Sequence, residues 1–226
     1  MNVISLYFAL WVTVDHGGQD ILYSVALSLS MFAVAVSVPV LGAISDSNGK
    51  RQRPLISLTL VCAISTALIG GTSNLWIGLI LFIIANYCYQ SALVFYNGML
   101  PSVSKGTHVG LVSGYGVSLG YLGSIAGLLL VKPFVEENSR SAAFLPTAAL
   151  VLLFALPCFF FVRDPEKKPP ISIQIKKVFT TLKDTFLRIK HYKSLFQFVI
   201  IHFLILDAVN TIIAFMAVYA TKVIGF

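Results

Sequence analysis

Six long segments of this sequence consist almost entirely of apolar residues, and they constrain the fold more than any other feature. They are Ile21–Ile44, Leu55–Gly71, Leu75–Leu100, Val109–Val131, Ala142–Val162 and Leu195–Tyr219. Each has about 17 residues or more, which is enough for an α-helix to cross a hydrocarbon layer of about 30 Å. The sequence therefore predicts an all-α membrane protein with a helix in each segment.

The composition argues against the other classes of protein. Hydrophobic residues make up 57% of the chain and charged residues 11%, whereas soluble domains have about 45–50% and about 25%. A soluble enzyme is not expected, and disorder is excluded because so apolar a chain does not stay solvated. The three cysteines (Cys62, Cys88 and Cys158) lie far apart within apolar segments. Neither a metal site nor a cofactor is therefore expected.

The basic residues lie between the apolar segments in an alternating pattern. Thirteen of the sixteen follow the first, third or fifth segment: Lys50, Arg51, Arg53, Lys105, Arg163, Lys167, Lys168, Lys176, Lys177, Lys183, Arg188, Lys190 and Lys193. Positively charged loops stay on the cytoplasmic side of a membrane, so these loops are predicted to be cytoplasmic. The net charge of +7 is then a feature of topology, and no nucleic-acid partner is expected.

The longest connection, residues 163–194, is predicted to link two membrane bundles. Its prolines at positions 165, 169 and 170 prevent a helix from continuing. From Ile175 to Ile189, apolar residues recur at helical spacing among basic ones, which predicts an amphipathic helix on the cytoplasmic membrane surface. A regulatory site for lipid or calmodulin is the alternative. The predicted units are a bundle of residues 1–162, this linker, and residues 195–226 as the first helix of a second bundle.

A short segment at the end of the first apolar run carries the most specific motif, Gly42, Asp46, Gly49, Lys50 and Arg51. The glycines permit close helix approach and a tight turn, and the carboxylate lies beside several cations. We predict a charge-paired latch between helices that separate during function. The pattern Gly-x-x-x-Asp-x-x-Gly-basic-basic resembles the loop motif of the major facilitator superfamily.

Four further stretches narrow the resemblance. Residues 39–46, 92–101 and 113–123 look like the vacuole-effluxer-like branch of that superfamily, and residues 203–213 are similar to its seventh helix. The resemblance implies a twelve-helix transporter that works by alternating access, and its eukaryotic members release amino acids from vacuoles. It also implies the plasma (inner) membrane of a bacterium or the vacuolar membrane of a eukaryote.

The twelve-helix pattern assigns a place to each segment. Met1–Val14 is too short to span a membrane, so it is expected to be the end of a first helix whose beginning is missing. The segment Leu195–Tyr219 corresponds to helix seven. The chain is then expected to be an N-terminal six-helix bundle with a truncated first helix, plus helix seven, and its missing C-terminal half is an expected partner.

Polar side chains within Leu75–Leu100 mark a candidate substrate site. Asn86, Gln90 and Asn97 fall on one helical face, and Tyr89 flanks it. Amides are unfavourable in hydrocarbon, so they should face the bundle interior or a water-filled cavity. Substrate binding by Asn86, Gln90 and Tyr89 is one interpretation, and hydrogen bonding between helices is the other. Asn97 is expected to brace the turn that ends this helix.

Asp207 is the only charged residue well inside an apolar segment. A carboxylate at this depth either carries a proton or pairs with a cation. We predict proton coupling at Asp207 and substrate binding at the neighbouring Asn210. His202 lies on another face and is expected to be a packing residue, with proton relay as the alternative.

The segment Val109–Val131 carries a narrow stripe of glycines, Gly116, Gly120, Gly123 and Gly127. Such a stripe is typical of close packing between membrane helices. A helix that slides during transport would use the same smooth surface.

Together these features favour a secondary transporter in the lipid bilayer that moves a small polar solute and is coupled to protons. The chain is not expected to be an enzyme. A membrane-embedded transferase is one alternative, but it needs clustered chemical groups and the four histidines are scattered. A non-transporting truncated fragment is the other alternative.

Overall fold

The computed structural model describes residues 2–17, 19–48, 51–104, 108–137, 139–162, 164, 180, 193–219 and 224. Within these ranges the chain is helical and contains no strand. Gly49, Lys50 and, apart from Thr180, the predicted amphipathic helix of the linker lie outside the described residues.

The helices follow the apolar segments of the sequence, so the predicted all-α membrane fold is confirmed. In chain order they are α1 (Asn2–Leu10), η1 (Trp11–Asp15), α2 (Asp20–Asn48), α3 (Gln52–Gly70), α4 (Leu75–Val103), α5 (Val109–Glu137), η3 (Arg140–Ala143), α6 (Phe144–Phe161) and α8 (Lys193–Tyr219). Five helical stretches in the described ranges are long and apolar enough to cross a membrane: Asp20–Ala43, Gln52–Gly70, Leu75–Pro101, Val109–Glu136 and Arg140–Phe161. The apolar stretches Val3–Asp15 and Phe196–Ile212 are shorter.

Local sequence explains where individual helices begin and bend. Asn74 precedes α4, and its side chain accepts hydrogen bonds from the backbone N–H groups of Trp76 (2.9 Å) and Ile77 (3.3 Å). This is the usual N-cap arrangement of an asparagine. Prolines occur inside α2, α4, α5 and α6, which membrane helices tolerate because their neighbours satisfy the freed backbone groups.

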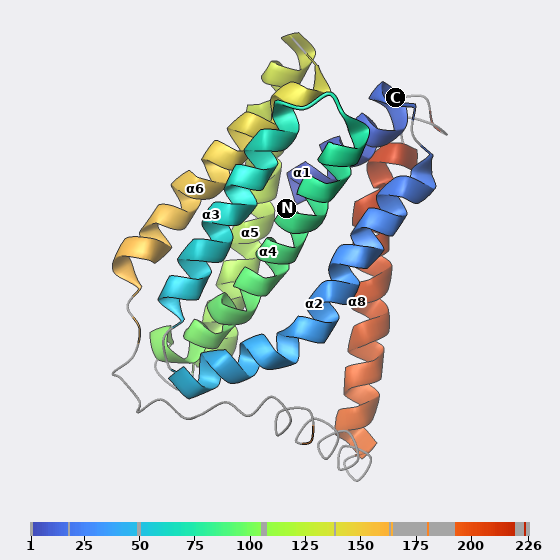
Figure 1. The fold of residues 1–226 in the computed structure, drawn as a ribbon. Helices are drawn as coiled ribbons and strands as arrows, with labels where there is room; N and C mark the ends of the chain where they lie inside the picture. Colours follow the sequence, from blue (N-terminus) through green and yellow to red (C-terminus); the bar gives the residue numbers. More distant parts are fainter. Residues whose placement is uncertain are drawn as a thin grey trace.

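The helices form one bundle with two distinct ends (Figure 1). At the η1 end, η1, the α3–α4 turn (residues 71–74) and η3 come together. At the linker end, α2 and α4 finish, α3 begins, and Asp164 follows α6. α4 packs against α2 and α3, α3 also packs against α6, and α8 packs against α1 (Figure 1).

The largest buried cluster among the described residues lies toward the η1 end and combines aromatic with aliphatic side chains. Phe8 stacks on Phe82 with ring centroids 4.3 Å apart, and Trp11, Tyr23 and Phe144 surround this pair. A T-shaped contact of 5.9 Å between Tyr23 and Phe215 attaches α8 to the same cluster. Elsewhere large apolar side chains face outward, with Phe161 85% exposed, as expected where the surroundings are hydrocarbon rather than water.

Candidate functional site

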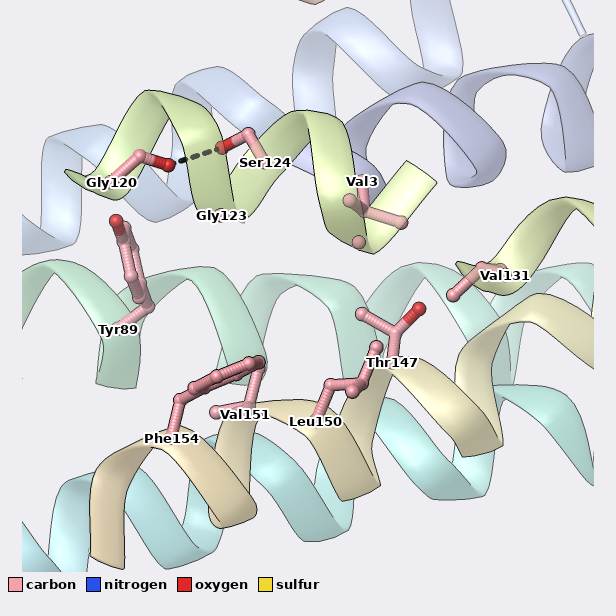
Figure 2. Close-up of a pocket in the computed structure, with 11 residues that line it drawn as sticks. Val3, Tyr89, Gly120, Gly123, Ser124, Val131, Thr147, Leu150, Val151 and Phe154 are labelled. Atoms are coloured by element: carbon pink, nitrogen blue, oxygen red, sulfur yellow. Dashed lines mark hydrogen bonds between the residues drawn. The ribbon is translucent and has the colours of Figure 1, made fainter. Parts of the chain in front are cut away.

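A cavity of about 250 Å³ lies inside the bundle between α1, α4, α5 and α6 (Figure 2). It extends from Tyr89, in the middle of α4, toward Val131 and Thr147 on the side of the η1 end. Its lining is mostly apolar but includes three hydroxyl groups. The lining residues are Val3, Tyr89, Gly120, Gly123, Ser124, Gly127, Val131, Thr147, Leu150, Val151 and Phe154. Phe154 is 68% exposed, so the cavity is open at that side.

The three hydroxyl groups differ in what they offer to a solute. Ser124 Oγ donates to the Gly120 carbonyl (3.1 Å) and Thr147 Oγ1 donates to the Ala143 carbonyl (2.6 Å). Both hydroxyls have therefore used their hydrogen within their own helix and remain acceptors. Tyr89 projects from α4 toward Gly120 and Ser124 across the cavity (Figure 2). The cavity thus suits a small, largely apolar solute with a few polar groups.

The glycines of the α5 stripe line cavities in the structure. A Cβ atom placed on Gly120 or Gly123 would have no neighbour within 4 Å, because these residues face the cavity instead of a helix. A Cβ on Gly127 would meet only Val3 Cγ2, at 3.5 Å. Gly116 lines a second cavity of about 310 Å³ between α4, α5 and α6. Among the described residues, no neighbouring helix therefore packs against Gly120 or Gly123, and close packing along the stripe stays a prediction.

Asn86 and Gln90 face α2, whereas Tyr89 faces α5. Asn86 is 2% exposed, and its Nδ2 donates to Ser30 Oγ at 2.7 Å. Gln90 Nε2 points to the Met31 sulfur at 3.7 Å. The structure therefore does not bring Tyr89 together with the two amides. Asn86 makes the hydrogen bond between helices that the sequence left open as the alternative to substrate binding.

Asp207 and Asn210 lie on exposed surface of α8. Within the described ranges Asp207 makes no hydrogen bond or ion pair. His202 stacks on Phe198 with ring centroids 5.7 Å apart. The structure does not bring Asn210 to the amides of α4, since the contact of α8 with the aromatic cluster is at Phe215.

Arg51 organises a polar network at the linker end. Its guanidinium donates from Nε to Ser45 Oγ (2.9 Å) and from Nη1 to the Gly98 carbonyl. Asp164 Oδ1 accepts hydrogen bonds from the backbone N–H groups of Arg51 (2.8 Å) and Gln52 (2.9 Å). The network therefore joins the end of α2, the end of α4 and the residues after α6 to the start of α3.

Only part of the predicted latch is visible in this network. Arg51 has the role of a cation that holds helix ends together, and Asp46 belongs to the last turn of α2. A Cβ on Gly42 would meet nothing within 4 Å. Ser45, Gly98 and Asp164 were not predicted from the sequence. Only Asp164 carried a signal, as an acidic residue directly after the last apolar segment of the bundle.

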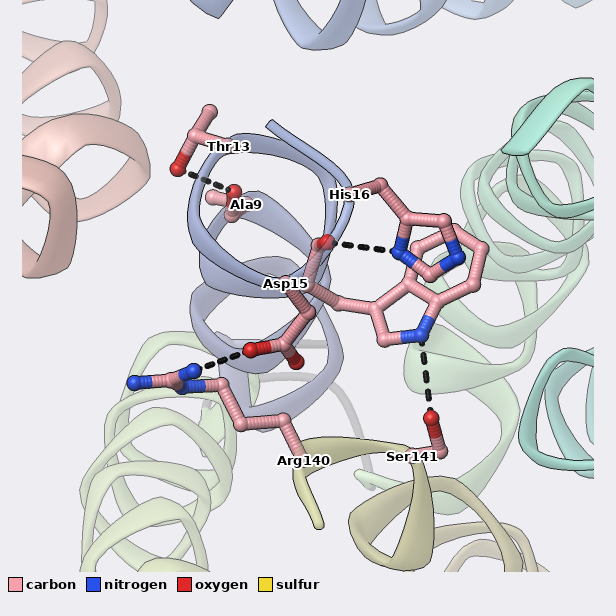
Figure 3. A network of polar contacts seen from close by, with 7 residues as sticks. Ala9, Thr13, Asp15, His16, Arg140 and Ser141 are labelled. Carbon is pink, nitrogen blue, oxygen red and sulfur yellow. Dashed lines mark hydrogen bonds and ion pairs between the residues drawn. The ribbon is translucent and has the colours of Figure 1, made fainter. Parts of the chain in front are cut away.

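A second polar network closes the η1 end (Figure 3). Arg140 of η3 forms an ion pair with Asp15 of η1, and Trp11 Nε1 donates to Ser141 Oγ at 3.0 Å. His16 lies within hydrogen-bond distance of the Trp11 and Ser73 carbonyls. These residues were also missed, because they come from connections that the apolar pattern does not relate to one another.

Comparison with known proteins agrees with this architecture. The family model described as Major Facilitator Superfamily matches residues 1–226. An uncharacterised MFS-type transporter of Bacillus subtilis, YxiO, is 32% identical over an alignment that covers 86% of this chain and 49% of the relative. The multidrug resistance protein MdtG of Salmonella arizonae is 25% identical, with 100% of this chain and 54% of the relative covered.

The chain spans about half the length of the curated relatives that it matches. No solved structure matches it. Because the family model matches the whole sequence and the structure is a bundle of membrane-spanning helices, this chain belongs to the major facilitator superfamily.

Proposed function

We propose that this chain forms part of a secondary active transporter that moves a small solute by alternating access. The observation that carries the proposal is the 250 Å³ cavity inside the bundle, with one polar network at each end of the bundle. A transporter of this kind needs a solute site near the middle of the bilayer and contacts at both ends that form and break in turn. The cavity supplies space for such a site, and we propose that the two networks are contacts of this kind.

The proposed solute is small, with an apolar portion and a few polar groups. Tyr89, Ser124 and Thr147 supply the polar contacts, and Leu150, Val151 and Phe154 supply the apolar wall. An amino acid with an apolar side chain fits this description, and amino-acid efflux is what the vacuole-effluxer-like resemblance implies. Drug efflux is the second candidate, favoured by the name of the MdtG relative.

Asp207 is proposed to carry the coupling proton. It is a carboxylate within the apolar stretch Phe196–Ile212 of α8, and carboxylates inside membrane segments commonly serve as proton carriers in transporters. Asn210, one turn further along, is proposed to contact the solute together with Gln90 and Tyr89 as α8 moves relative to α4. Asn86 is assigned a smaller part, because its amide already binds Ser30.

The linker end is proposed to be the cytoplasmic end, because it carries most of the basic residues. The latch of Gly42, Asp46, Gly49, Lys50 and Arg51 then holds this end closed in one phase of the cycle. Asp164 supports the latch by fixing the start of α3. The glycine face of α5 leaves room for the helix to shift. We also propose that α8 is the first helix of a second bundle. The proposed location is the plasma membrane of a bacterium.

Disruption of the native gene in its host tests the proposal, because the comparison is then made with the complete protein that the host produces. Cells preloaded with radiolabelled leucine, alanine or lysine should release the apolar amino acids more slowly after disruption, while a plasmid-borne copy restores the rate. Parallel measurements with ethidium test the second candidate. Unchanged efflux of every compound would contradict transport and favour the non-transporting alternative.

A further inference from the structure

His16 occupies an unusual position between two backbone carbonyl groups. It follows η1 and precedes Gly17, whose φ of 57° turns the chain toward α2. The imidazole Nδ1 lies 3.1 Å from the Trp11 carbonyl oxygen, and Nε2 lies 2.9 Å from the Ser73 carbonyl oxygen. The ring therefore bridges η1 to the α3–α4 turn.

The number of protons on the ring determines whether both contacts are hydrogen bonds. Carbonyl oxygens accept hydrogen bonds and donate none. A neutral imidazole has one N–H, so it satisfies one carbonyl and turns a nitrogen lone pair toward the other. The imidazolium cation has two N–H groups and donates to both Trp11 and Ser73. Only the protonated ring can therefore turn both contacts into hydrogen bonds.

The imidazole of His16 also lies beside the indole ring of Trp11. Its ring centroid lies 4.0 Å from that of Trp11, which is within the range of cation–π attraction. The ionisable groups on the surrounding described elements are Asp15 of η1, Asp20 at the start of α2 and Arg140 of η3. Arg140 is the only cation among the three, and it is paired with Asp15. The α3–α4 turn, residues 71–74, has no ionisable side chain.

We propose that His16 is a proton-binding site, and that its protonated form holds the η1 end closed. Loss of the proton removes one of the two hydrogen bonds and replaces it with repulsion between a lone pair and a carbonyl oxygen. Because histidines change charge between about pH 5 and 8, physiological changes in pH can operate this contact. The site is separate from Asp207 and from the solute cavity, so it does not depend on the proposed function.

Distance measurements between the two bridged elements test this site. Spin labels are placed on Gln19→Cys and Ser73→Cys in a chain whose native cysteines are replaced, reconstituted in lipid nanodiscs. The distance distribution should be narrow at about pH 5.5, and longer and broader at about pH 8.5. His16→Gln should abolish the dependence on pH, and His16→Arg, a permanent cation with several donors, should stay narrow at both values.

The matched control is His202→Gln, because His202 lies on α8 and stacks only on Phe198 among the described rings. This variant should retain the pH response of the parent. A distance that does not change with pH in the parent would overturn the proposal, as would a pH response that persists in His16→Gln. If His16→Gln fails to fold, the His16→Arg variant decides instead. A distance that changes with pH in His16→Arg, which is a permanent cation, would also overturn the proposal.

Discussion

Trp11 lies directly over Gly78, so closely that a side chain at position 78 has no room. A Cβ atom placed on Gly78 would lie 2.5 Å from Cη2 and 2.6 Å from Cζ3 of the indole ring. The ring is held from several sides, because Nε1 donates to Ser141 and Phe8 stacks against it. The absence of a side chain on α4 thus allows η1 to close the η1 end of the bundle.

Gly78→Ala should therefore destabilise the protein by about 1–3 kcal/mol, the usual penalty for overpacking a buried site. Thermal unfolding of the purified chain in detergent measures this change. Gly114→Ala is the matched control, since a Cβ there would meet nothing within 4 Å. Equal unfolding temperatures for the two variants would show that the Trp11–Gly78 contact is not rigid.

Asp164→Ala should lower the stability by about 1 kcal/mol, because two backbone N–H groups at the start of α3 lose their acceptor. Asp164→Asn keeps an oxygen acceptor and should lose less. Glu136→Ala serves as the control, since Glu136 is paired only with the exposed Lys132 among the described ion pairs and such pairs contribute little. Denaturation of the three variants side by side measures these differences in stability. A loss of stability in Glu136→Ala as large as in Asp164→Ala would refute the capping role of Asp164.

Asn86 and Ser30 should show energetic coupling as the partners of one buried hydrogen bond between α4 and α2. Asn86→Ala, Ser30→Ala and the double variant form a mutant cycle, and the coupling should be about 0.6 kcal/mol, typical of membrane proteins. The free energy of unfolding is the readout. Additive effects of the two substitutions would instead favour a role for Asn86 in binding solute.

Asp207→Asn should abolish uphill accumulation of solute while leaving downhill exchange intact, because the amide cannot carry the coupling proton. Transport with and without an imposed pH gradient separates the two processes in cells that produce the complete protein. Accumulation that is still driven by pH in this variant would show that Asp207 has only a structural part.

The helices were predictable because a bilayer requires long apolar segments, and that requirement is visible in sequence alone. Their ends were less predictable. The first apolar segment ends at Ile44, but α2 continues to Asn48. α4 likewise continues through Pro101 to Val103. Both helices extend beyond the apolar run into polar residues, where hydropathy gives no boundary.

The candidate site was predictable only in part, because sequence periodicity indicates which residues share a face but not what lies opposite. Tyr89 was identified and lines the cavity, whereas Ser124 and Thr147 were missed. Asn86 was correctly expected to avoid lipid, but its partner Ser30 lies 56 residues away in the chain. The contacts of Arg51 with Asp164 and of Asp15 with Arg140 also depend on helix arrangement.

The rate of leucine efflux from preloaded cells tests most directly whether the cavity between α4, α5 and α6 lies on the solute path. Gly123→Leu fills the cavity, and Gly110→Leu places the same side chain at an open position near the start of the same helix. Provided that both variants reach the membrane in equal amounts, Gly123→Leu should slow efflux by about tenfold or more and Gly110→Leu by less than about twofold. Equal efflux rates in the two variants would contradict a solute site in this cavity.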